Sequence, residues 1–123
     1  MKNENSLRLR HILDAIQAIE NFVREVDEQR FVAEQMRHDA TIRQLEIIGE
    51  AAKNLSEDLR QENPQVAWKE ACRTRDRLAH GYFQLNLKII WDIAQNDLPI
   101  LKKQIEKILE NEKCIWATRT KKK

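Results

Sequence analysis

The sequence predicts an all-α protein, folded as an antiparallel bundle of four or five helices. The 123 residues include only two glycines and two prolines, which favours long helices because these residues are the poorest helix formers. Apolar residues also recur at spacings of three and four in several long segments, the period of one helix face. The length suits a single domain with a modest core. We assign the domain to residues 1–113 and a flexible basic tail to residues 114–123.

The first helix is expected over residues 6–26, with Ser6 as its N-cap. A short element over residues 30–36 follows. The apolar stripe of the first helix repeats every three or four positions and should face the core; it consists of Leu9, Ile12, Ile16, Ile19 and Val23.

A second long helix is predicted from a cap at Asp39 to about Leu55. Gly49 falls in its interior, where glycine costs roughly 1 kcal/mol relative to alanine. A glycine in this position suits a contact in which another backbone approaches closely. Ala51 and Ala52 extend the slim surface, so we expect a tight helix–helix contact there.

Ser56 is a candidate cap for a short helical turn that ends near Glu62. Pro64 then interrupts the chain, because proline disfavours the helical conformation of the residue before it. A third helix should span residues 66–79 and place Trp68 and Leu78 in the core or an interface.

The last helix is expected to begin near residue 86 or 87 and to end near Lys113. Pro99 lies inside it and lacks a backbone donor. Either Pro99 kinks the helix or Asp97 caps a restart. The buried side should consist of Ile90, Ile93, Leu101, Ile105 and Ile108.

The net charge of +2 conceals an uneven distribution, because residues 111–123 contain five basic residues and one acidic residue, which leaves the body mildly acidic. Overall charge therefore gives no support for broad nucleic-acid binding. Locally, Lys69, Arg73 and Arg77 cluster around Arg75. This cluster is either an RNA-binding surface or an ordinary solvated basic face.

The sequence has no apolar run of the roughly 20 residues that a membrane span needs, and its first residues do not resemble a signal peptide. We therefore expect a cytoplasmic protein without membrane association. Cys72 and Cys114 should be reduced, packed thiols, since their spacing does not suit a metal site. The three scattered histidines predict no metal ion, and no phosphate-binding loop or other motif predicts a cofactor.

Residues 73–83 gather the most chemistry in the chain, with Arg75, His80 and Tyr82 close to Gly81. Arginine can grip phosphate oxygens in a bidentate manner, and histidine can exchange protons near neutral pH. Five residues correspond to about 140° on a helix, so Arg75 and His80 can share a phosphate only if the helix ends or distorts between them. Gly81 makes such an end plausible.

These side chains suit metal-independent cleavage of RNA, in which a ribose 2′-hydroxyl attacks the adjacent phosphorus. His80 would be the acid or base, and Arg75 would stabilise the transition-state charge. Tyr82 would bind a phosphate oxygen or a base, and Asp76 would orient Arg75 or His80. A single histidine near a helix end is more often structural than catalytic, but a symmetric dimer would present two copies at one cleft.

The segment from Arg75 to Tyr82 resembles the Arg-x4-His-x-Tyr motif of the HEPN superfamily, and more narrowly that of HepT-like toxins. Residues 47–53, Ile-Ile-Gly-Glu-Ala-Ala-Lys, are similar to the second-helix signature of that family. The resemblance covers residues 7–109 and includes one departure, because Asp76 stands where the family often has Asn. The other matching positions, in the expected order, are Pro64, Trp68, Trp91 and residues 97–99, Asp-Leu-Pro.

The resemblance implies an all-helical homodimer and a metal-independent ribonuclease toxin, with Arg75 and His80 as the catalytic pair in a cleft between subunits. It implies RNA, either tRNA or mRNA, as the substrate. It also implies an MntA-like nucleotidyltransferase antitoxin that attaches AMP to Tyr82, where added negative charge would repel RNA. The alternative is a non-catalytic helical dimer that binds a nucleotidyltransferase, with nucleotide or RNA as optional further ligands. A purely structural scaffold ranks last.

Overall fold

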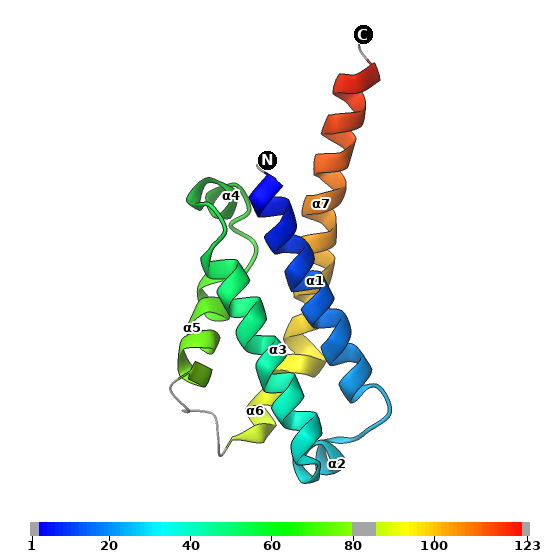
Figure 1. The fold of residues 1–123 in the computed structure, drawn as a ribbon, viewed down its shortest axis with the longest axis vertical. Coiled ribbons are helices and arrows are strands. Elements are labelled where there is room, and N and C mark those ends of the chain that lie inside the picture. The colour runs from blue at the N-terminus through cyan, green and yellow to red at the C-terminus, as the bar shows by residue number, and fades with distance from the viewer. Residues whose placement is uncertain (1–2, 80–85, 122–123) are drawn as a thin grey trace.

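The computed structural model describes residues 3–79 and 86–121, with side chains described for residues 4–78 and 86–111. These residues form helices joined by short connections, so the predicted all-α class is confirmed (Figure 1). The elements in chain order are α1 (Asn3–Val23), α2 (Glu28–Ala33), α3 (Gln35–Lys53), α4 (Glu57–Glu62), α5 (Trp68–Ala79), α6 (Leu87–Asp92), the π-helical turn η1 (Ile93–Asp97) and α7 (Leu98–Lys121).

The long helices lie side by side along one axis and alternate in direction (Figure 1). α3 packs along both α1 and α5, while α7 packs along α1. α2 and α6 close one end of the bundle, and α4 lies near its other end (Figure 1). α3 is thus the helix that connects the α1 side of the core to α5.

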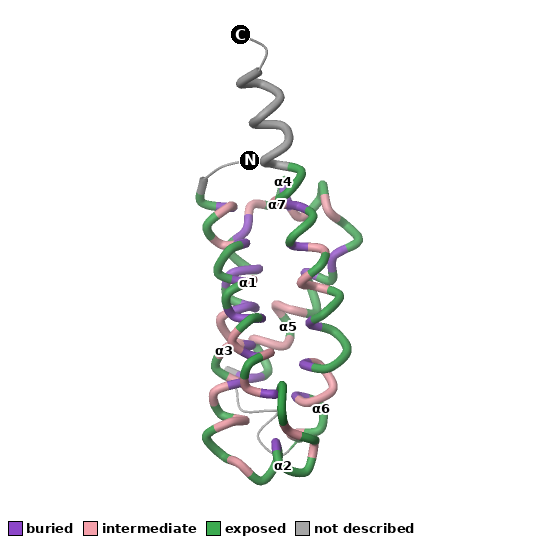
Figure 2. The backbone as a smooth tube through the Cα atoms, turned by 90° about the vertical axis from the view of Figure 1, so that its right-hand side faces the viewer, coloured by how far each residue is buried: buried purple, intermediate pink, exposed green. Residues whose placement is uncertain are grey.

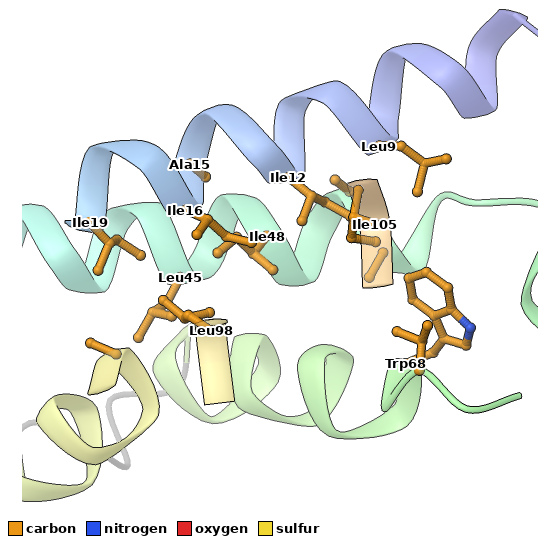
Figure 3. Packing of buried hydrophobic residues seen from close by; sticks show 14 of the residues in the cluster. Leu9, Ile12, Ala15, Ile16, Ile19, Leu45, Ile48, Trp68, Leu98 and Ile105 are labelled. Atoms are coloured by element: carbon orange, nitrogen blue, oxygen red, sulfur yellow. The ribbon is translucent and has the colours of Figure 1, made fainter. Parts of the chain in front are cut away.

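The predicted stripe of α1 forms one wall of the core. Leu9, Ile12 and Ile16 are completely buried, and Ile19 is almost completely buried. Figure 3 shows these side chains pointing toward Leu45 and Ile48 of α3 and toward Ile105 of α7. Buried positions recur along the lengths of α1 and α3 in Figure 2, as expected for helices that bury one face each.

The prediction of Ser6 as the N-cap of the first helix is wrong, because α1 begins at Asn3 and Ser6 lies inside it. Asn5 makes the long-range contact at this end instead. Its Nδ2 donates to Ser56 Oγ at 2.9 Å, and its Oδ1 accepts from the Ser56 backbone N–H at 3.1 Å. Ser56 also accepts from the Leu59 backbone N–H at 3.2 Å, so its predicted role as the cap of α4 is confirmed.

Asp39 does not cap the second long helix, because α3 has already begun before it. The cap in this region is Asp27, whose Oδ1 accepts from the Arg30 backbone N–H at 2.8 Å and starts α2. Glu34 then joins the two helices by binding Arg30 Nε at 2.5 Å and Arg37 Nε at 2.8 Å. This ion-pair bridge stabilises a sharp turn that periodicity alone does not reveal.

The C-terminal helix accommodates Pro99 without a break. The Leu98 N–H bonds to the Ile93 carbonyl across the wider turn η1, directly before Pro99. Proline lacks an N–H, and its ring clashes with a carbonyl in an ordinary α-turn, so a local widening relieves both problems. Asp97 therefore lies within a continuous helix rather than capping a restart. The helix also continues to Lys121, beyond the end predicted near Lys113.

Candidate functional site

Arg75 lies near the end of α5, on the side of that helix that faces α3. The residue beneath it is Gly49, inside α3 and toward the C-terminal end of that helix. A Cβ atom added to Gly49 would collide with the Cβ of Arg75, and would lie 3.0 Å from its Cγ and 2.7 Å from the carbonyl oxygen of Ala71. The tight contact predicted at Gly49 is therefore confirmed, and its partner is the helix that carries Arg75.

The guanidinium of Arg75 is paired with the residue next to it in the chain. Its Nη1 lies 3.2 Å from Asp76 Oδ1, and 32% of the Arg75 side chain is exposed against 55% for Asp76. Arginine side chains commonly bury their aliphatic stem and keep the charged end in water. Asp76 thus lies where it can orient Arg75 and partly neutralise the positive charge of the guanidinium.

The other half of the predicted site, His80 and Tyr82, lies outside the described residues, as does Gly81. α5 is described through Ala79, so the chain reaches the position directly before His80 as helix. The proximity of Arg75 to His80 and the helix end at Gly81 remain predictions.

The predicted RNA-binding residues Lys69, Arg73 and Arg77 are all exposed. Because they are four residues apart, they form one row along α5. Arg75 is two residues from Arg73, which places it about 160° around the helix. The row and Arg75 therefore do not form one continuous surface on α5.

A different set of charges lies near Cys72, which is a half-buried free thiol. Burial raises the pKa of this thiol, while the positive charges of Arg60 and Lys53 oppose the rise and Asp76 adds to it. Lys53 at the end of α3 and Arg60 on α4 consequently lie close to this part of α5. Sequence spacing did not select them because they come from separate helices and belong to no motif. The side chain of Cys114 lies outside the described part of the chain.

Two hollows open on the described surface near α5, and Arg75 lines neither of them. One is a mainly apolar groove of ≈ 340 Å³ between α5 and the η1–α7 region, lined in part by Ile48, Ala71 and Leu101. The other, of ≈ 560 Å³, lies beside α4 and the start of α5. Arg75 thus lies outside both hollows, and the predicted cleft between subunits remains a prediction.

Among the residues whose side chains are described, no three histidine, cysteine or carboxylate side chains come together in a way that could hold a metal ion. His11 is exposed on α1, and His38 lies beside α2 with its Nδ1 3.2 Å from the Phe31 carbonyl oxygen. None of the described helices is both long enough and apolar enough to cross a membrane.

Comparison with known proteins places this chain in a family. The family model described as "Ribonuclease HepT-like" matches residues 12–108. A "Probable ribonuclease HepT" of Thermococcus cleftensis is 39% identical over 108 residues, which cover 88% of this chain and 98% of that protein. A "Putative RNase" of Caldanaerobacter subterraneus subsp. tengcongensis is 40% identical over 105 residues, or 85% of this chain and 94% of that protein.

A further "Putative RNase", of Methanocaldococcus jannaschii, is 43% identical over 100 residues, which cover 81% of this chain and 83% of that protein. No solved structure shows a significant match to the chain. The matched range contains α3 with Gly49 and all of α5 with Arg75. With nearly the full length of two relatives covered, the chain belongs to the HepT-like ribonuclease family.

Proposed function

We propose that this protein is a cytoplasmic, metal-independent ribonuclease that acts as the toxin of a bacterial toxin–antitoxin pair. The observation that carries the ribonuclease proposal is the family match, which extends over residues 12–108 and includes the helix of Arg75. The residues Arg75, His80 and Tyr82 stand at the spacing of the family motif.

The reaction is an internal transfer at phosphorus. The 2′-oxygen of a ribose forms a bond to the adjacent phosphorus, and the bond from phosphorus to the 5′-oxygen of the next nucleotide breaks. His80 removes the proton from the 2′-hydroxyl or gives one to the leaving 5′-oxygen. Arg75 stabilises the additional negative charge on the phosphoryl oxygens. The half-buried position of Arg75 supports this role because partial burial reduces the screening of its charge by water.

The working unit in this proposal is a homodimer. Each chain brings one His80, whereas separate acid and base groups make both proton transfers easier. A two-fold axis would place two copies of the motif at one cleft. Among the described residues, 32% of the Arg75 side chain is exposed, which supports a site that a second chain completes.

The activity is switched off when an MntA-like nucleotidyltransferase transfers AMP from ATP to the hydroxyl of Tyr82, with release of pyrophosphate. The added group is bulky and negatively charged, so it fills the cleft and repels RNA phosphates. Neither tRNA nor mRNA is favoured by the described residues.

The ribonuclease proposal is tested by incubating purified protein with total RNA in EDTA. Wild-type protein should produce fragments that end in cyclic phosphates, while Arg75→Ala and His80→Ala should leave the RNA intact. His11→Ala is the matched control, because it removes an exposed histidine from α1, far along the chain from the motif. Equal cleavage by wild-type and His80→Ala proteins would refute the proposal.

Regulation is tested separately by adding an MntA-like nucleotidyltransferase and ATP. The intact mass should rise by whole AMP units, and cleavage should fall in proportion. Tyr82→Phe should retain its original mass, and its own level of cleavage should not fall further when the nucleotidyltransferase and ATP are added. A Tyr82→Phe protein that still gains AMP would show that the modification site is elsewhere.

One observation favours a second candidate, a non-catalytic dimer that binds a nucleotidyltransferase and RNA. Asp76 Oδ1 lies 3.2 Å from the Arg75 guanidinium and offsets the charge that catalysis would need. The EDTA experiment separates the two candidates, because the binding module would form a stable RNA complex without fragments.

A further inference from the structure

Gly49 and Arg75 belong to different helices, yet no atom separates the glycine from the stem of the arginine. A Cβ on Gly49 would overlap the Cβ of Arg75. The same Cβ would lie 2.7 Å from the Ala71 carbonyl oxygen, whereas ordinary van der Waals contact begins at 3.4 Å. Any side chain at position 49 would therefore push α5 away from α3 by several tenths of an ångström or more.

The contact lies at the turn of α5 that carries Arg75. Ala71 and Arg75 are four residues apart, so they lie on the same face of α5, one turn after the other. Gly49 touches the backbone at the first and the side-chain stem at the second. Within the packing of α3 against α5, Gly49 therefore lies under both the backbone and the Arg75 stem at this point of α5.

The stem position determines where the guanidinium can reach. The Arg75 side chain is half-buried, with its Cβ and Cγ over Gly49 and its charged end at Asp76. Backbone and carbon atoms at this contact cannot adjust independently, unlike the free end of a flexible side chain. A displacement of α5 is therefore transmitted to the guanidinium.

We propose that Gly49 is a positioning residue for Arg75: its missing side chain lets α5 approach α3 closely enough to hold the guanidinium where the phosphate will lie. This inference rests on the proposed ribonuclease function and extends it to a residue outside the Arg-x4-His-x-Tyr motif. Gly49 does not touch the substrate, so it acts only through Arg75.

The test compares Gly49→Ala with wild type in the full-length protein. The substrate is a labelled single-stranded RNA that contains every dinucleotide step, and kcat and KM are measured separately. We expect kcat to fall by about tenfold to hundredfold, since displacing a catalytic group by about 1 Å can have an effect of that size. KM should change by less than about threefold, because the remaining RNA contacts of the protein are unaltered.

Ile16→Val is the matched control, because Ile16 is completely buried on α1, which packs along α3, and its side chain lies beside Ile48 in Figure 3. It loosens the same core without changing the Gly49 contact. Thermal unfolding of both variants shows whether each is folded at the assay temperature. A loss of kcat in Ile16→Val as large as that in Gly49→Ala would overturn the proposal, since general loosening would then explain both.

A double-mutant cycle separates positioning from any other role of Gly49. In the Arg75→Ala background, Gly49→Ala should cause no further loss of the residual cleavage, because the group that it positions is gone. An additional tenfold loss would overturn the proposal. Full kcat in a folded Gly49→Ala protein would overturn it as well.

The side-chain Nε–Hε signal of Arg75 in ¹⁵N-labelled protein gives a readout that does not depend on activity. Gly49→Ala should shift this signal, and Ile16→Val should leave it in place. If wild-type protein cleaves no RNA, the ribonuclease proposal fails while this spectroscopic comparison still decides the contact. If Gly49→Ala does not fold in buffer, the comparison is repeated in trimethylamine oxide, which favours compact states. Failure to fold there would overturn the proposal, because the contact would then support the fold as a whole.

Discussion

Arg75 Nη1 and Asp76 Oδ1 lie 3.2 Å apart near the end of α5, so the cation that is proposed to meet RNA already has an anionic neighbour. A guanidinium has five N–H donors in a rigid fork, and this contact uses one nitrogen of the fork. The remaining donors can still meet a phosphate, but the carboxylate repels the same phosphate. Asp76 therefore orients Arg75 and weakens its attraction for RNA.

The Asp76→Asn substitution should tighten RNA binding by about twofold to fivefold, in line with the modest energies of exposed ion pairs. Asparagine keeps the size of the side chain and an oxygen acceptor for Arg75 while removing the negative charge. Binding is measured by fluorescence anisotropy in a His80→Ala background, which prevents cleavage. Glu106→Gln on the exposed side of α7 is the control. Unchanged or weaker binding by Asp76→Asn would contradict the electrostatic role.

The Arg73→Gln substitution should weaken RNA binding and reduce its dependence on salt. Each phosphate contact with single-stranded RNA contributes about 0.7 to the slope of log affinity against log salt concentration, so one lost contact should lower the slope by about that amount. Because Arg73 lies about 160° around α5 from Arg75, kcat at saturating RNA should stay unchanged.

The control for Arg73 is Arg43→Gln, which removes an exposed arginine from α3. If Arg73→Gln and Arg43→Gln behave alike, the row formed by Lys69, Arg73 and Arg77 is a solvated face without a role in RNA binding. A parallel loss of kcat in Arg73→Gln would instead show that the row reaches the reacting phosphate.

Glu34 should make stability depend on pH in the acid range. Its hydrogen bonds with Arg30 and Arg37 lower the pKa of its carboxyl below the ordinary value of 4.5. A carboxyl with a lowered pKa in the folded state stabilises that state above its unfolded pKa, and this contribution is lost as the pH falls through the folded value. The melting temperature of Glu34→Gln should therefore lie below that of wild type at neutral pH, and the gap should shrink as the pH falls below 4.5.

Thermal melts over a series of pH values check this expectation, with Asp14→Asn as a control that removes an exposed carboxylate from α1. A gap between wild type and Glu34→Gln that is the same at neutral and acid pH would show that the charge of Glu34 does not hold α2 to α3.

The core could be predicted from the sequence because burial on a helix follows a short repeat. Helical periodicity places Ile12, Ile16 and Ile19 on one face of α1 wherever that helix lies in the bundle. Their burial could therefore be predicted without knowing which helix packs against them. Helix ends were harder. Asp39 has the chemistry of an N-cap, but Glu34 sets the turn through two arginines on opposite sides of it, and no local rule ranks these possibilities.

The candidate site also has one part that could be predicted from the sequence and another part that could not. Arg75 and Asp76 are adjacent in the chain, so the sequence already suggested their pairing. Lys53 and Arg60 belong to other helices and to no motif, yet their positive charges oppose the rise in the pKa of Cys72. Gly49 in α3 predicted a close helix–helix contact, but the spacing of residues could not predict which helix would make it.

By itself the sequence determined the helical class, the faces that each long helix buries and the family motif from Arg75 to Tyr82. These properties depend on residue types and on short repeats along the chain. Only the tertiary structure decided that α5 lies on Gly49, with Arg75 directly over it and the basic row turned away. That arrangement depends on how helices distant in sequence fit together, because the shape of the contact surface, and not the local periodicity, selects the partner and its angle.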